Sequence, residues 1–107
     1  MHPDADVQFH KMLKDKNQIV NSTSEVFEVD VYSPKPLLIG EAVNFYNEEE
    51  FKKLEKLFKI RIYFKKEMNI DIDHVYFFTH DIDESIEHKV RKYCNENEIT
   101  LVKEKDL

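Results

Sequence analysis

Two apolar segments joined by a proline turn predict a pair of adjacent strands in the first half of the chain. Residues 25–32 alternate in polarity, so a strand there places Glu28 and Asp30 on one face and the apolar side chains on the other. Residues 37–43 are nearly all apolar, as expected of a strand buried on both faces. Residues 33–36 contain two prolines, which disfavour the interior of a strand and predict a tight connection.

Apolar residues spaced three and four apart predict a long helix over about residues 47–66. Asn47 can cap this helix, and Glu50 three residues later completes a capping box. The predicted apolar face contains Phe51, Leu54, Leu57, Phe58, Ile62 and Phe64. Before the first clear strand, the pattern predicts a short amphipathic helix at residues 4–14 and a weak strand at residues 17–21.

The last third of the chain predicts a strand, a helix and a final strand. Residues 74–79 are apolar on both faces, which is typical of a central strand. Either Asp81 or Asp83 can cap a helix that runs to about residue 96, and Asn97 is a candidate left-handed stop. Residues 99–103 form the final predicted strand.

The predicted element order is therefore α-β-β-β-α-β-α-β. Three consecutive strands favour an antiparallel meander, and each later helix crosses over to a further strand of the sheet. We expect one α/β domain over residues 1–107, with a mixed β-sheet between flanking helices.

Composition and charge narrow the classes of function. The formal net charge of −6 argues against a broadly basic nucleic-acid surface, although a carboxylate metal site is itself acidic until a cation binds. Lysines concentrate in residues 52–66 and acids in residues 25–50 and 71–87. A single cysteine, Cys94, excludes an intramolecular disulfide framework. No apolar run reaches membrane-spanning length, so we expect a soluble, cytoplasmic protein without a membrane partner.

Asp30 and Glu41 are the candidate chemical pair, because each stands near the end of one of the two adjacent predicted strands. If the strand register sets them opposite each other, their carboxylates can bind a divalent cation. The alternative is an ordinary pair of charged residues held in salt bridges. Glu41 is harder to explain in this way, since a buried acid is costly unless it is paired or bound to metal. Gly40, the only glycine, can mark a close approach of another backbone, a bulge or a tight helix crossing.

This element order, with an Asp near the end of the second strand and a Glu in the third, resembles the PD-(D/E)XK nuclease superfamily, which has the restriction-endonuclease-like fold. The segment EVDVYSPKPLLIGEAV, residues 28–43, is most similar to small archaeal RecB-like nuclease relatives. The resemblance implies that Asp30, Glu41 and the main-chain carbonyl of Ala42 bind Mg²⁺ or Mn²⁺. It also implies hydrolysis of phosphodiester bonds, with DNA favoured over RNA as substrate, and a possible homodimer.

The chain departs from this family where a lysine is expected. The family pattern E-x-K reads Glu41, Ala42 and Val43 here, and valine cannot position water or offset charge. Some relatives take this lysine from the following helix, where Lys53 and Lys56 are the candidates for a catalytic role. The alternative function is a catalytically degenerate member of the fold that serves as a nucleic-acid-binding or assembly module.

Other candidate sites have simpler explanations. The acidic run His80-Asp81-Ile82-Asp83-Glu84 follows a strand and precedes a helix, so helix capping explains it without a metal. The lysines of the long helix are also consistent with a solvated face supported by charge pairs four residues apart. No His/Cys cluster has zinc spacing, and Cys94 is expected to be a small packing residue.

Overall fold

The structure, a computed structural model, describes residues 17–20 and 26–107. The predicted helix at residues 4–14 lies outside the described residues. The strands are β1 (Asn17–Val20), β2 (Val26–Val29), β3 (Val31–Pro34), β4 (Leu37–Tyr46), β5 (His74–Ile82) and β6 (Thr100–Lys103). The helices are α2 (Phe51–Met68) and α3 (Glu87–Glu96), with short 3₁₀ turns η1 (Glu48–Glu50) and η2 (Glu104–Asp106).

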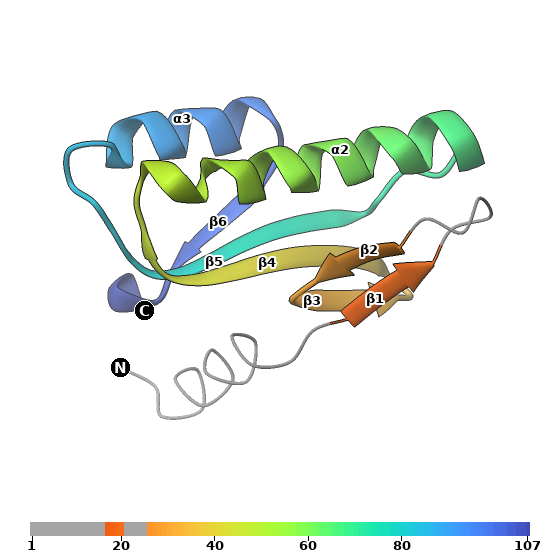
Figure 1. The fold of residues 1–107 in the computed structure, drawn as a ribbon, viewed down its shortest axis with the longest axis horizontal. Helices are drawn as coiled ribbons and strands as arrows, with labels where there is room; N and C mark the ends of the chain where they lie inside the picture. The colour runs from red at the N-terminus through yellow and green to blue at the C-terminus, as the bar shows by residue number, and fades with distance from the viewer. Residues whose placement is uncertain (1–16, 21–25) are drawn as a thin grey trace.

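The predicted mixed sheet is confirmed and has the strand order β3-β4-β5-β6. β3 and β4 are antiparallel, whereas β4, β5 and β6 run parallel, and β1 and β2 form a separate antiparallel pair. Both helices cover the same face of the sheet (Figure 1). This follows from two successive crossovers of the same hand, because β5 lies beside β4 and β6 beside β5 in one direction. A helix on the other face, as the predicted sandwich requires, is not found among the described residues.

The predicted single strand at residues 25–32 is wrong in one respect, because it is divided at Asp30 into β2 and β3. The chain bends there, and the consecutive residues Val29 and Asp30 are both buried, which simple alternation does not allow. The physical reason is a tertiary hydrogen bond to the Asp30 carboxylate, described below. Four strands therefore precede α2 where three were predicted.

Helix α2 follows β4 after a short turn and packs back over it. The Asn47 side chain accepts a hydrogen bond from the Glu49 amide and so caps the 3₁₀ turn η1, whereas α2 itself begins at Phe51 and has no side-chain cap. The buried side chains of α2 are Leu54, Leu57, Ile60 and Phe64. Three members of the predicted apolar face are instead exposed, namely Phe51, Phe58 and Ile62. The apolar residues of this helix cover a wider arc than the sheet can bury.

The predicted boundaries of α3 need correction. β5 continues through Asp81 to Ile82, so Asp81 is a strand residue and not a helix cap. Asp83 instead closes the turn before the helix, since its carboxylate accepts hydrogen bonds from the amide and hydroxyl of Ser85. The left-handed residue after α3 is Glu98, with φ of 54°, and not Asn97.

The core lies between the helices and the sheet. Its largest fully buried side chains include Tyr46, Phe77, Ile39, Leu54 and Leu57, drawn from β4, β5 and α2. No helix in the described part of the chain is both long enough and apolar enough to span a lipid bilayer.

Candidate functional site

Asp30 and Glu41 lie together under helix α2. The β3–β4 register pairs Val31 with Gly40, so the next position sets Asp30 opposite Glu41. Both residues are almost completely buried, with Asp30 3 % and Glu41 2 % exposed. Their side chains are hydrogen-bonded to each other. The bend between β2 and β3 thus turns Asp30 inward to meet the carboxyl group of the neighbouring strand.

A backbone contact fixes the position of Asp30. Its Oδ2 accepts a hydrogen bond of 2.7 Å from the amide of Ala42, at a buried position. A charge-assisted bond of this kind is short and strong, and it stabilises a carboxylate out of water. This bond explains why the chain bends at Asp30, since a regular strand would not bring this carboxylate to the Ala42 amide.

A lysine of α2 completes the group. The Lys56 Nζ lies 2.5 Å from Oε1 of Glu41, although Lys56 itself is partly exposed. The short turn at Asn47 returns α2 over β4, which brings the second turn of the helix above Glu41. Lys53, the other candidate, lies 4.0 Å from Glu50 instead. Val43, at the position where the resemblance leads us to expect a lysine, is buried in the core.

Burial and the neighbouring charges shift the ionisation of Glu41. Loss of water raises its pKa to about 7, and the hydrogen bond and charge of Asp30 act in the same direction, while Lys56 opposes them. A divalent cation bound here would favour the ionised form of Glu41 and so lower this pKa.

Glu41 and Lys56 line a cavity with a basic rim, and Asp30 lies behind Glu41, outside its lining. The volume of this cavity is about 370 Å³, and it is lined by Glu28, Glu41, Lys52, Lys53 and Lys56. Glu28 is exposed, as expected of an outer position rather than of a buried ligand. An acidic floor beneath lysines suits a substrate that carries phosphate together with a cation that bridges it to the carboxylates.

The donor atoms of the site fit a hard divalent cation. In an extended strand the amide and carbonyl of one residue point to the same edge, so the Ala42 carbonyl lies on the edge of β4 that faces Asp30. Asp30, Glu41 and this carbonyl offer oxygen ligands of the type that Mg²⁺ and Mn²⁺ prefer. Within residues 17–20 and 26–107, no group of three or more His, Cys, Asp or Glu side chains is close enough to hold a metal. Any cation here would use two carboxylates, a carbonyl and water.

The structure distinguishes between the alternatives for Gly40. A methyl group added there would lie 3.2 Å from the Tyr76 carbonyl oxygen and 3.3 Å from the Cβ of Val31. The glycine therefore permits close approach of the strands on both sides of β4, immediately before Glu41.

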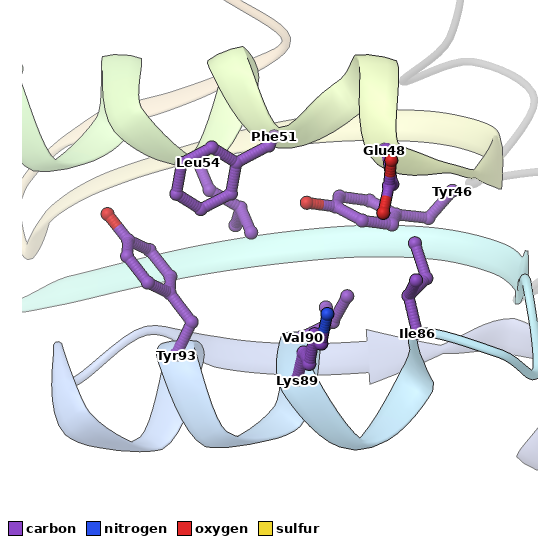
Figure 2. Close-up of a pocket in the computed structure, with 8 residues that line it drawn as sticks. All are labelled: Tyr46, Glu48, Phe51, Leu54, Ile86, Lys89, Val90 and Tyr93. Carbon is purple, nitrogen blue, oxygen red and sulfur yellow. The ribbon is translucent and has the colours of Figure 1, made fainter.

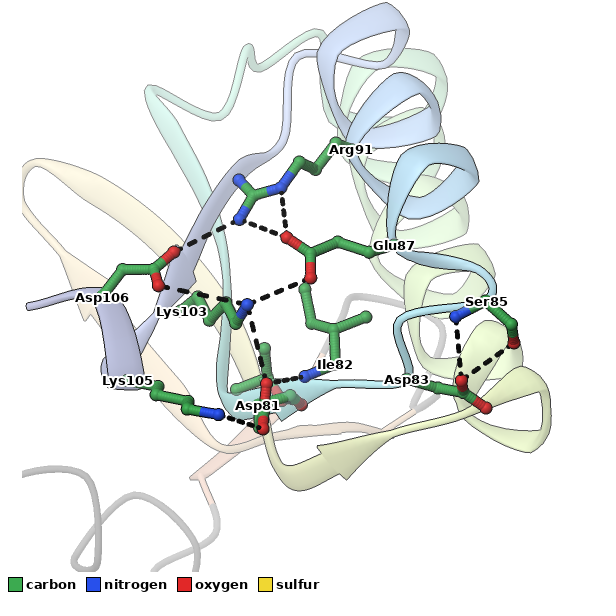
Figure 3. Close-up of polar contacts among 10 residues, drawn as sticks. Asp81, Ile82, Asp83, Ser85, Glu87, Arg91, Lys103, Lys105 and Asp106 are labelled. Carbon is green, nitrogen blue, oxygen red and sulfur yellow. Dashed lines mark hydrogen bonds and ion pairs between the residues drawn. The ribbon is translucent and has the colours of Figure 1, made fainter.

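Acidic residues at the end of β5 and the start of α3 are held in ion pairs, as Figure 3 shows. Asp81 lies 3.6 Å from Lys103 and 3.2 Å from Lys105, and Glu87 pairs with Lys103 and Arg91. A backbone hydrogen bond from Ile82 and the nearby lysines lower the pKa of Asp81. These contacts tie β5, α3 and η2 together, which explains the acids without a metal.

Two further features were not predicted. Glu104 is buried and lies 3.2 Å from Nδ1 of His80, a pair that connects η2 to β5. An apolar cleft of about 420 Å³ separates α2 from α3, with Tyr46, Phe51 and Tyr93 among its lining residues (Figure 2). Both join residues far apart in the chain, so local periodicity carries no signal for them. Cys94 is buried in the core, as predicted.

Comparisons with protein-family models, with curated proteins and with solved structures found no match to this chain. Its function is therefore argued from the geometry and chemistry of its own residues.

Proposed function

We propose that this protein is a divalent-metal-dependent nuclease whose active site consists of Asp30, Glu41, the Ala42 carbonyl and Lys56. The observation that carries the proposal is the 2.5 Å contact between the Lys56 amine and the Glu41 carboxylate, beside Asp30. A carboxylate pair can hold a divalent cation, and a lysine at its edge can offset negative charge on a phosphate, which together suit phosphodiester hydrolysis. Lys56 supplies from α2 the positive charge that Val43 cannot supply from β4.

Each residue has a distinct task in the proposed reaction. Asp30, Glu41 and the Ala42 carbonyl would hold Mg²⁺ or Mn²⁺, which would polarise the phosphate and lower the pKa of bound water. Asp30 is positioned for this by the Ala42 amide. Lys56 would leave Glu41 when a cation takes its place, and its amine would then orient the attacking water and offset the negative charge that develops on the phosphate.

Lysines of the rim favour an extended polyanion as the substrate. Lys52 and Lys53 line the same cavity as Glu41 and precede Lys56 by one helical turn. They would bind phosphates beside the scissile one, which positions a strand without reading its bases. The proposed substrate is DNA, and the overall negative charge of the protein restricts binding to this local basic rim.

The fold that accompanies this proposal is the restriction-endonuclease-like fold. If β2 and β3 are the two halves of one bent strand, three strands precede α2, as that fold requires, and α2 then crosses over to the parallel strand β5. Asp30 at the bend, Glu41 in β4 and then helix α2 follow one another in the order expected of that fold. The chain differs from the fold's usual pattern in its lysine, Lys56, which comes from α2 and not from β4.

An assay of cleavage tests the proposal. Plasmid, single-stranded and branched DNA, together with RNA, are incubated with the protein and Mg²⁺ or Mn²⁺, comparing the wild type with Glu41→Ala. We expect metal-dependent cleavage of DNA that Glu41→Ala reduces by about a hundredfold or more. Cleavage that survives the substitution would contradict the site, since contaminating nucleases are the usual source of such activity.

A second candidate function is a non-cleaving, nucleic-acid-binding module of the same fold. The observation that favours it is the ion pair between Lys56 and Glu41, in which the lysine offsets the charge of the carboxylate without a bound metal. Calorimetry separates the two: the nuclease binds Mn²⁺ at this site and loses that binding in Glu41→Ala. DNA binding without Mn²⁺ binding or cleavage would support the module instead.

A further inference from the structure

The apolar cleft between α2 and α3, which we call the α2–α3 cleft, shares no lining residue with the cavity at Glu41. Its volume of about 420 Å³ lies in the range of cavities that bind small molecules. Apolar and aromatic side chains form its walls, namely Tyr46, Phe51, Leu54, Ile86, Val90 and Tyr93. The rings of Phe51 and Tyr93 meet edge to face across the cleft, with centroids 5.0 Å apart (Figure 2). These walls suit an aromatic group, which can pack against rings on more than one side.

A buried hydroxyl group in the cleft has no partner within the protein. Tyr46 is 2 % exposed, and its ring is held edge to face against that of Phe77. Its hydroxyl points into the cleft (Figure 2) and forms no hydrogen bond with the residues that the structure describes. Burial raises the pKa of Tyr46, so the phenol stays protonated and can donate a hydrogen bond. Because buried polar groups are normally paired, this donor indicates a ligand with an acceptor.

Two opposite charges also line the cleft. Glu48 lies in η1, before α2, and Lys89 lies in α3, so they reach the cleft from its two sides (Figure 2). Both side chains are exposed, and neither forms an ion pair with any residue in the described part of the chain. The next lysine of α3, Lys92, is by contrast paired with Glu96. A carboxylate and an ammonium group that face one cleft without pairing are complementary to a ligand that carries both charges.

We propose that the α2–α3 cleft is a binding site for an aromatic α-amino acid. The aromatic side chain of the ligand would lie between the rings and aliphatic side chains of the walls. Lys89 and the Tyr46 hydroxyl would donate hydrogen bonds to the carboxylate of the ligand, and Glu48 would accept them from its ammonium group. Glu48 and Ile86 follow the carboxyl ends of the parallel strands β4 and β5, the edge of such sheets at which ligands usually bind.

The polar groups of the cleft select this ligand over others. A purely apolar ligand would leave the Tyr46 hydroxyl buried without a partner. An anionic ligand such as a nucleotide would place further negative charge beside Glu48, and a cationic ligand would place positive charge beside Lys89. An amino acid carries both charges on neighbouring atoms and has no net charge. This site does not depend on the proposed nuclease function, because none of its residues belongs to the nuclease site.

Titration of the full chain with L-phenylalanine, L-tyrosine and L-tryptophan, followed by calorimetry and heteronuclear NMR, tests the ligand class. We expect at least one of them to bind with a dissociation constant below about 1 mM and to shift the amide signals of Ile86 and Val90. For the tightest ligand, the matching arylpropionate lacks the ammonium group and the arylethylamine lacks the carboxylate. Each should bind at least about tenfold more weakly, and so should L-alanine. Failure of all three amino acids to bind, or an analogue that binds as tightly, would overturn the proposal.

Three substitutions that keep the fold test the residues of the site. Tyr46→Phe removes only the unpartnered hydroxyl, so it should leave the thermal unfolding midpoint unchanged and weaken the amino acid at least about fivefold. Glu48→Gln and Lys89→Met should each weaken it by a similar factor. Glu49→Gln and Lys92→Met are the matched controls, because both residues are exposed and lie outside the cleft, and they should bind like the wild type. Wild-type affinity in any of the three variants, or an equal loss in the controls, would overturn the proposal.

Discussion

At the scale of single residues, the site depends on two carboxyl groups that the fold removes from water. Burying such groups is costly, and a protein keeps them only with compensating partners. Asp30 has the Ala42 amide, and Glu41 has Asp30 and Lys56. These contacts hold the two carboxyl groups side by side, where their oxygens are available to a cation.

The raised pKa of Glu41 predicts a pH-dependent stability. Folding raises this pKa from 4.5 to about 7, so between these values the folded state binds more protons than the unfolded state. The free energy of unfolding should therefore fall as the pH rises from about 5 to 8, by up to about 3 kcal/mol. Denaturant unfolding of the wild type and Glu41→Gln measures this, since the amide does not titrate. Equal pH profiles for the two proteins would contradict the ionisation described here.

Gly40 gives a second prediction at this scale. The Gly40→Ala methyl group would press on the Tyr76 carbonyl and on Val31, so we expect a loss of about 1–3 kcal/mol in the free energy of unfolding. Asn44→Ala, at an exposed position of the same strand, is the control and should change stability by less than about 1 kcal/mol. A neutral Gly40→Ala would show that the strands can move apart there.

At the scale of elements, sequence patterns predicted the long segments but not the bend that makes the site. Apolar spacing predicted the presence of α2 and a continuous apolar run predicted β5, although Phe51, Phe58 and Ile62 of the predicted α2 face are exposed. The division at Asp30 could not be predicted, because it depends on a hydrogen bond to a residue in another strand. The choice between Lys53 and Lys56 likewise depends on how α2 lies over β4.

Sequence patterns also could not tell which apolar residues of α2 face the sheet. Phe51, Phe58 and Ile62 have the spacing of a buried face, yet the structure leaves them exposed. The sheet lies under Leu54 and Leu57 and not under these three residues, and its position cannot be read from the spacing within the helix.

At the scale of the whole molecule, the net charge is negative, yet the cavity beside α2 has a basic rim. Both helices lie on one face of the sheet (Figure 1). Lys52 and Lys53 of α2 line the cavity together with Glu41. If this rim binds phosphates, the affinity for DNA should come from these few lysines and should fall strongly as the ionic strength rises.

Reversing the charge of this rim should therefore weaken DNA binding. For the double variant Lys52→Glu and Lys53→Glu, we expect at least about tenfold lower affinity in fluorescence anisotropy and a salt dependence shallower by about two counterions. Lys92→Glu, on the exposed side of α3, is the matched control and should bind like the wild type. Equal losses in both variants would indicate a general charge effect and not a binding rim.

We propose that Lys56 takes the catalytic role for which Val43 is unsuited. The most direct measurement is the single-turnover rate of Mn²⁺-dependent DNA cleavage by the wild type, Lys56→Met and the control Lys92→Met, with Mn²⁺ binding followed by calorimetry. We predict that Lys56→Met loses about a hundredfold or more in rate while still binding Mn²⁺, and that Lys92→Met cleaves normally. A Lys56→Met variant that cleaves at the wild-type rate would contradict the account.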